Sequence, residues 1–160
     1  MTDYPTSGPG SPATALPRAM SRLTDFVLSV LAPWAVLGAI LRSHVHNGKL
    51  EISTGAKVAV VAVLLLVPFL YETAFVAWRG QTPGKMIGGL RVLSRANGEV
   101  PTIRDAAIRA VIPLPFLGAM LFEPALLLGY IAVFASAAVA KGLPIGWHDR
   151  AAGTIVVRTR

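Results

Sequence analysis

Several ionisable side chains of this chain lie in or beside long apolar segments, where a charge is costly unless it is paired or has a chemical task. Arg18, Arg22 and Asp25 stand at the start of the first apolar segment, at positions i, i+4 and i+7. On a helix these residues share one face, and Arg22 and Asp25 are close enough to pair. Two interpretations stay open: a basic anchor with an acidic neighbour, or an ionised Asp25 that contributes to a polar site.

Glu72 lies inside the second apolar segment, about six residues before its end and so roughly 9 Å deep by the rise of a helix. A carboxylate at such depth must be paired or protonated. Arg79, Arg109 and the two N-terminal arginines are candidate partners. We consider both a structural ion pair and a role in ion or proton handling.

Asp149 follows His148 in the sequence Trp-His-Asp-Arg near the end of the chain. A His–Asp pair is typical of general-base catalysis, but no serine or cysteine nucleophile with supporting residues accompanies it. We favour a cap and turn before a last strand, with Asp149 bound by an arginine. The candidate cluster, for ion and proton handling or for structural pairing, comprises Arg18, Arg22, Asp25, Glu72, Arg109 and Asp149.

Two further motifs resemble a phosphate-binding loop and a metal site, but their residue patterns do not support either site. Residues 80–89 (GQTPGKMIGG) lack the spacing of a phosphate-binding loop, and Met86 replaces its serine or threonine. We interpret residues 82–84 as a tight turn that leads the chain off the membrane. His44 and His46 have no third ligand nearby for a metal ion. We therefore expect neither a cofactor nor a metal site.

The composition indicates an integral membrane protein of at most one domain. Hydrophobic residues make up 54% of the 160 residues and charged residues only 14%, where soluble domains carry about 25%. The formal net charge is +7, but no basic helix or aromatic-basic pattern predicts nucleic-acid binding. Orientation in the membrane and contact with anionic lipid of the inner leaflet explain the charge better. The proline- and glycine-rich residues 1–17 predict a disordered tail before a membrane domain at 18–158.

Three apolar blocks must position the candidate cluster. Residues 23–41 and 57–78 each have the length of one membrane-spanning helix, and Pro33 is expected to kink the first. The block 111–140 is too long for one helix without a steep tilt and too short for two full spans. Because Glu123-Pro124 interrupts it, we predict two short helices, at about 108–122 and 124–141, that form a shallow hairpin or cross a thinned bilayer.

Charge counting predicts that both termini are cytoplasmic. Four crossings place twelve of the fifteen basic residues inside, whereas three crossings give eight inside and seven outside. Strand patterns agree, because residues 89–93 and 154–158 can form neighbouring strands only on one side of the membrane. Residues 88–102 also read as a strand, an Asn-Gly turn and a second strand. The predicted fold is an all-α membrane protein with four transmembrane segments and a small cytosolic β patch.

These residues also match a known family. The chain resembles the RDD family of small bacterial membrane proteins, which is named for an arginine and two aspartates. The matching blocks occur in order over about residues 18–158, and Ser21 stands where related sequences often have alanine. The blocks are Arg18 with Asp25, then Tyr71-Glu72, residues 80–85 (GQTPGK), residues 89–92 (GLRV), Arg109, and His148-Asp149-Arg150 followed by residues 152–157 (AGTIVV).

The resemblance implies a multi-pass protein of the bacterial cell membrane, for which transport of ions or small ligands, including sodium/proton exchange, has been proposed. We hold two hypotheses. One is proton- or sodium-linked transport that uses Glu72 and Asp25. The other is a non-transporting scaffold or accessory subunit with a structural charge cluster. We expect no enzyme activity. Because four short helices make a thin bundle, we expect a homo-oligomer or a partner membrane protein.

Overall fold

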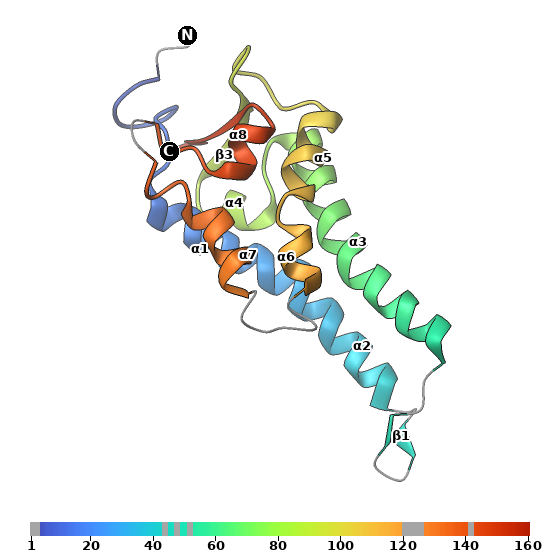
Figure 1. Ribbon diagram of the computed structural model, residues 1–160. Helices are drawn as coiled ribbons and strands as arrows, with labels where there is room; N and C mark the ends of the chain where they lie inside the picture. The colour runs from blue at the N-terminus through green and yellow to red at the C-terminus, as the bar shows by residue number, and fades with distance from the viewer. Residues whose placement is uncertain (1–3, 43–44, 47–48, 51–52, 120–126, 141–142) are drawn as a thin grey trace.

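The computed structural model describes residues 4–42, 45–46, 49–50, 53–119, 127–140 and 143–160, and two long helical rods dominate it (Figure 1). The first rod comprises α1 (Ala15–Phe26), the π-helical turn η1 (Val27–Leu31) and α2 (Ala32–Arg42), and the second rod is α3 (Thr54–Arg79). The short antiparallel strands β1 (Val45–His46) and β2 (Lys49–Leu50) lie at the end of the molecule where the chain passes from one rod to the other (Figure 1).

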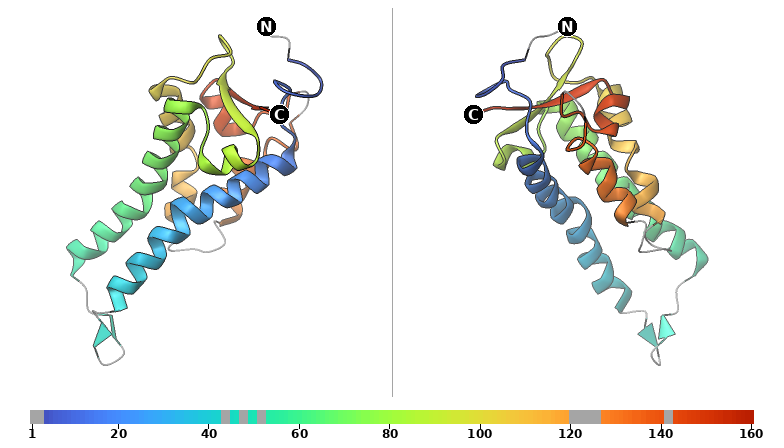
Figure 2. Two further views of the ribbon diagram at one scale, coloured as in Figure 1. Left: turned by 180° about the vertical axis from the view of Figure 1, so that it is seen from behind. Right: turned by 60° about the vertical axis from the view of Figure 1, so that its left-hand side comes forward.

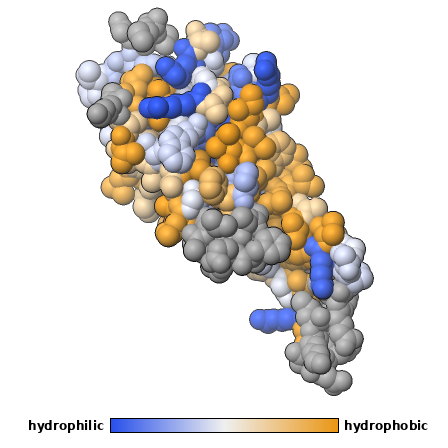
Figure 3. Space-filling model, viewed as in Figure 1, coloured by the Kyte–Doolittle hydropathy of each residue, from blue (hydrophilic) through white to orange (hydrophobic). Residues whose placement is uncertain are grey.

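Both rods are long and apolar enough to cross a membrane, at Ala15–Ala39 and Thr54–Arg79. Only 18% and 11% of their most apolar windows are buried within the protein, so most of their apolar side chains face outwards. Soluble monomers rarely expose so much contiguous apolar surface. Figure 3 shows apolar residues along the middle of the molecule and hydrophilic residues towards its ends. The prediction of a mostly helical fold is confirmed, and the described residues contain two candidate membrane spans where we predicted four transmembrane segments.

The rods extend beyond the predicted segments 23–41 and 57–78. Pro33 cannot donate a hydrogen bond to the carbonyl of Ser29, and the widened turn η1 comes directly before it. Within the same stretch of the rod, the hydroxyl of Ser29 donates to the backbone carbonyl of Asp25 at 2.7 Å. In the second rod Ser53 caps the helix start by accepting from Ala56 N at 3.2 Å, and Pro68 lies inside α3 without ending it.

Short elements form a cap at the other end of the rods (Figures 1 and 2). They are α4 (Pro83–Ile87), β3 (Leu90–Ser94), α5 (Ile103–Val111), α8 (Trp147–Ala151) and β4 (Thr154–Arg158). Strands β3 and β4 pair antiparallel, with Val92 opposite Val156, which confirms the predicted neighbouring strands.

The predicted hairpin over residues 88–102 is wrong. A turn with Gly98 at φ 74° is present, but residues 99–102 form no strand. Strand β3 pairs with β4 instead, whose Ile155, Val156 and Val157 are each at most 3% exposed. Pairing with this buried strand removes more apolar surface from water than a local hairpin would.

Residues 10–13 lie along the other edge of β4. The backbone N–H groups of Gly10 and Ala13 donate to the carbonyls of Arg158 and Val156 at 2.8 and 2.9 Å. Pro12 forms an isolated antiparallel bridge with Val157. These backbone hydrogen bonds order residues 10–13. The structured part of the chain therefore begins within residues 1–17, which we predicted to be a disordered tail.

The core of the cap joins the sheet to the second rod. Val76 of α3, Ala106 of α5 and the strand residues Leu90, Val92 and Val156 form one buried cluster with Ala13. Gly80 ends α3 in a left-handed conformation, with φ 66°. A Cβ at this position would lie 2.7 Å from the carbonyl oxygen of Val92, so β3 crosses directly against the end of α3.

The third apolar block forms α6 (Leu114–Ala119) and α7 (Leu127–Ala135), which lie side by side (Figures 1 and 2). The predicted helix at 108–122 is divided, because the chain leaves α5 at residues 112–113, where Pro113 lacks an N–H donor. The predicted turn at Glu123-Pro124 lies outside the described residues. The described parts of α6 and α7 are six and nine residues long, which corresponds to about 9 and 14 Å by helical rise.

Close packing of α4 on α1 gives a test of this fold. A Cβ at Gly84 would lie 2.2 Å from the carbonyl oxygen of Ser21 and 2.8 Å from the Asp25 carboxylate. Gly84→Ala is therefore expected to lower the free energy of unfolding by about 1–3 kcal/mol, the usual cost of overpacking. Thermal unfolding of the purified protein in detergent measures the effect.

Gly38→Ala is the matched control, because a Cβ at Gly38 in α2 meets nothing within 4 Å. Alanine favours a helix over glycine, so this variant should unfold at the same temperature as the parent or higher. An equal effect of both substitutions would contradict the close approach of α4 to α1.

Candidate functional site

Arg109 of α5 stands at the centre of a buried network of ion pairs. Arg109 is only 2% exposed, and its guanidinium contacts both Glu72 of α3 and Asp149 of α8. Arg109 Nε donates to Asp149 Oδ1 at 2.9 Å, and Nη1 donates to Glu72 Oε1. One guanidinium thus ties together three elements that lie far apart in the sequence.

The arginines of α1 complete the network. Arg22 Nη1 lies 2.7 Å from Glu72 Oε2, and Arg18 Nη2 donates to Asp149 Oδ2. Arg18 Nη1 also donates to the Pro144 carbonyl at 2.7 Å. Each of the two carboxylates therefore accepts from two guanidinium groups, one on α1 and the other that of Arg109. Four helices meet at this network, and its polar groups are satisfied mainly by charge-assisted hydrogen bonds.

Asp25 occupies a neighbouring but separate place. Its carboxylate accepts from Thr82 Oγ1 at 2.5 Å and from Tyr71 Oη and the backbone N–H of Gly84 at 2.9 Å. Its cationic partner is Lys85, whose Nζ lies 3.5 Å from Asp25 Oδ2. Burial and the positive charge of Arg109 lower the pKa of Lys85 to about 8.

His148 packs against Arg109 as a neutral base. Arg109 Nη2 lies 3.2 Å from His148 Nε2, and because arginine only donates, Nε2 accepts and Nδ1 carries the proton. Burial lowers the pKa of His148 to about 3, with the charge of Arg109 acting in the same direction and that of Asp149 opposing it. The 3.6 Å separation of His148 Nε2 from Asp149 Oδ1 is therefore no ion pair at neutral pH.

Asp149 remains ionised in this environment. Burial raises the pKa of its carboxyl group, but the positive charges around it outweigh burial and hold the pKa well below its usual range. Because His148 is neutral at physiological pH, we assign this lowering to Arg109 and Arg18. A carboxylate held in this way does not exchange protons near neutral pH.

The structure brings together all six residues of the candidate cluster, but with partners that differ from two of our expectations. The predicted Arg22–Asp25 pair is wrong, because Arg22 reaches across to Glu72 on the other rod. Arg79 is no partner of Glu72, since its guanidinium stacks on Trp78 at 4.1 Å. The binding of Asp149 by arginine is confirmed, in a short helix rather than a turn.

Sequence reasoning missed the groups that hold Asp25. Residues 82–84 are not only a turn: Thr82 caps α4, and the same hydroxyl donates to Asp25. Lys85 follows as a buried cation, which the sequence analysis did not include in the cluster. The available signal was the Thr-Pro-Gly-Lys order, which is typical of a capped helix start with proline at its first position. Among the described residues no group of three His, Cys, Asp or Glu residues is placed to hold a metal, and His44 lies outside them.

The neutral state of His148 predicts a pH dependence. The unfolded chain takes up a proton near pH 6.5, whereas the folded chain resists it down to about pH 3. The stability contribution is therefore complete above pH 6.5 and is lost as the pH falls towards 3. The melting temperature in detergent should fall between pH 7 and pH 5, and less so in His148→Gln, whose amide oxygen still accepts from Arg109.

The low pKa of Asp149 restricts its own effect to pH values below about 3.8, outside this window. Equal slopes of melting temperature against pH for the parent and His148→Gln between pH 7 and pH 5 would show that His148 does not carry the dependence.

Comparison with known proteins identifies the family of this chain. No curated protein and no solved structure matches it. The model of the RDD family matches residues 12–153, which include both candidate membrane spans and every residue of the charge cluster. The chain belongs to the RDD family.

Proposed function

We propose that this chain crosses the membrane with its two rods, inserts α6 and α7 as a shallow hairpin, and keeps both termini in the cytoplasm. The length of the third apolar block, thirty residues at 111–140 where two full spans need about 40, supports a hairpin that returns to the side it entered from. The placement of twelve of the fifteen basic residues supports a cytoplasmic cap, which carries the sheet and the charge cluster.

Within this arrangement the charge cluster acts as a structural clamp of a membrane scaffold or accessory subunit. The observation that carries this proposal is the double pairing of Glu72 and Asp149, each with two guanidinium groups. Arginine does not release its proton in proteins. A carrier carboxylate must leave its partners in each cycle, and here each would have to leave two. A homo-oligomer or a partner membrane protein is part of the same proposal, since the bundle is thin.

A specific observation also favours proton- or sodium-linked transport, with Asp25 rather than Glu72 as the carrier. Asp25 accepts from neutral donors, and its ion-pair partner among the described residues, Lys85 at 3.5 Å, has a pKa of about 8. A cavity of about 20 Å³, large enough for a water molecule, lies beside Asp25, Ser29 and Tyr71. Because the pKa of Lys85 is about 8, this cation can lose its charge near neutral pH, which an arginine cannot do.

An enzyme is not proposed. His148 is turned towards Arg109 and kept neutral by burial, which is no arrangement for a general base acting on a nucleophile.

Fusions of a reporter that is active only in the cytoplasm test the topology. A reporter after Arg160 should be active, and one inserted between β1 and β2 should be inactive, because only three basic residues lie in that part of the chain. The reverse pattern, or activity at neither position, would refute the proposed orientation.

Two isosteric variants, assayed in proteoliposomes under sodium, potassium and proton gradients, separate the candidate functions. Glu72→Gln removes one partner of buried arginines and is expected to lower the free energy of unfolding by about 3–5 kcal/mol. If the clamp is the whole function, the parent protein and both variants carry no flux. If Asp25 is the carrier, Asp25→Asn should remain folded, since the amide oxygen still accepts from Thr82 and Gly84, and should lose the flux of the parent.

Flux that persists in a folded Asp25→Asn variant would eliminate Asp25 as the carrier. Flux that disappears in a fully folded Glu72→Gln variant would instead reject the clamp as the role of Glu72.

A further inference from the structure

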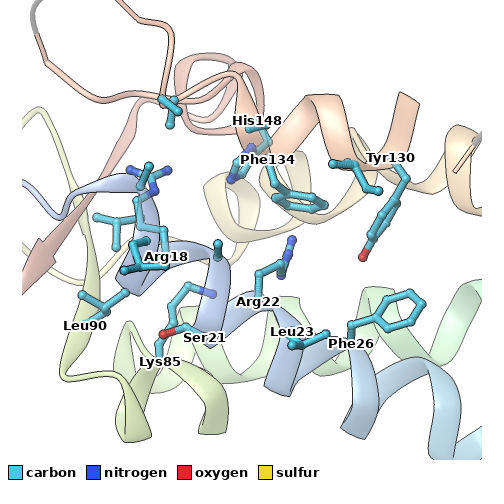
Figure 4. Close-up of a pocket in the computed structure, with 18 of the residues that line it drawn as sticks. Arg18, Ser21, Arg22, Leu23, Phe26, Lys85, Leu90, Tyr130, Phe134 and His148 are labelled. Carbon is cyan, nitrogen blue, oxygen red and sulfur yellow. The ribbon is translucent and has the colours of Figure 1, made fainter. Parts of the chain in front are cut away.

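An open cavity of about 600 Å³ lies between α1 and α7, beside the charge cluster (Figure 4). Its walls are mainly apolar, and Leu16 and Leu23 of α1 and Ile131 of α7, which line it, are each at least 51% exposed. The volume lies within the usual range of ligand pockets, about 300–1,000 Å³. With α7 inserted in the membrane as proposed above, a ligand can enter this cavity from the bilayer between α1 and α7.

The three arginines of the cluster and Lys85 line this cavity, and none of the carboxylates of the cluster does. The lining residues include Arg18, Arg22, Lys85 and Arg109, whereas Asp25, Glu72 and Asp149 are paired with these cations and do not line the cavity. The six residues of the cluster carry three positive and three negative charges, and Lys85, the partner of Asp25, adds one positive charge in excess. The lowered pKa of Lys85, caused by burial and by the charge of Arg109, agrees with an excess of positive charge.

Three residues that line the cavity also carry a buried donor atom that is not itself exposed to the cavity. Ser21 Oγ, Arg22 Nε and His148 Nδ1 are buried and have no hydrogen-bond partner in the part of the chain that the structure describes. Ser21 and His148 are only 3% and 2% exposed. Because Nε2 of His148 accepts from Arg109, its Nδ1 is a donor, as is Arg22 Nε. The preference of the cavity for an anionic ligand therefore rests on the cations that line it.

The two sides of the cavity differ in character. Figure 4 shows Arg18, Ser21 and Arg22 on α1 and Lys85 on α4, with Tyr130 and Phe134 of α7 opposite them. The Arg22 guanidinium lies over the Phe134 ring, 3.7 Å from its centroid. A ligand that fits both sides has an acidic head and an apolar chain.

We propose that this cavity binds the anionic headgroup of a membrane phospholipid, with the start of one acyl chain against the apolar wall between α1 and α7. A phosphodiester carries one negative charge, which equals the excess that Lys85 adds. The cavity lies at the beginning of the first membrane span, at the depth where headgroups are found, and basic pockets between membrane helices bind such headgroups. The inference rests on the membrane location and not on transport.

Lipid retention by the full-length protein tests the proposal. The protein is purified in a neutral detergent, mixed with dioleoylphosphatidylglycerol or dioleoylphosphatidylcholine, and examined by native mass spectrometry and thermal unfolding. The anionic lipid should be retained roughly tenfold more strongly than the zwitterionic one, the ratio that about 1.4 kcal/mol of charge interaction gives. It should also raise the melting temperature. Equal retention of both lipids would overturn the proposal.

A pair of substitutions on α7 locates the binding. Ala135 and Ala132 are both exposed, but only Ala135 lines the cavity. Ala135→Phe fills the cavity without touching an ion pair and should abolish the preference for the anionic lipid, whereas Ala132→Phe should preserve it. Lys85→Gln removes the excess charge and should reduce the tenfold preference to near equality. Equal preference in both alanine variants would place the lipid elsewhere and overturn the proposal.

Photocrosslinking keeps the test independent of how well any variant folds. Phosphatidylglycerol with a photoreactive group near its head should label peptides of α1 and α7 in the unmodified protein. Label confined to α2 and the first half of α3 would overturn the proposal. So would retention of oleate in place of phosphatidylglycerol, which would assign the cavity to free fatty acids. A dimer that is lost only in Ala135→Phe would assign it to a second copy of the chain.

Discussion

The buried guanidinium of Arg109 is the constraint on which the rest of the cap depends. A cation in this position cannot be neutralised by losing its proton, so it must be surrounded by acceptors. The chain supplies Glu72 from the second rod and Asp149 from α8. These two pairs require the C-terminal segment to return to the end of α3, and this return places β4 beside β3. The charge network and the sheet are therefore two consequences of one requirement.

Much of the site could be predicted from residue types, because a charge inside an apolar segment has few explanations. Arg18, Arg22, Asp25, Glu72, Arg109 and Asp149 all belong to the cluster. The choice of partners could not be predicted. Arg22 and Asp25 are close along one helix, but a local pair of this kind stabilises a helix by only about 0.2–0.5 kcal/mol. Tertiary partners across the two rods, which spacing along one helix does not reveal, outweigh it.

The fold shows the same division between local and long-range signals. The apolar lengths predicted both rods, and β-branched residues predicted both strands of the sheet. The Asn97-Gly98 signal gave a turn but no hairpin, because the buried face of β4 offers β3 a better partner. Pro113 lies at the break between α5 and α6, where hydropathy had predicted one continuous helix at 108–122. Lys85 was missed because its burial depends on the approach of α4 to α1, which Gly84 permits.

The distribution of charge also determines which elements can move. Helix α1 carries Arg18 and Arg22, so moving it away from the cap breaks pairs with both Asp149 and Glu72. Helix α7 carries no charged residue, and it closes the other side of the cavity. It can therefore shift without separating any ion pair of the clamp. A lipid that enters between α1 and α7 would displace only apolar contacts and the Arg22–Phe134 stacking. A rigid clamp and an adjustable apolar wall are compatible in this fold because they are built on different helices.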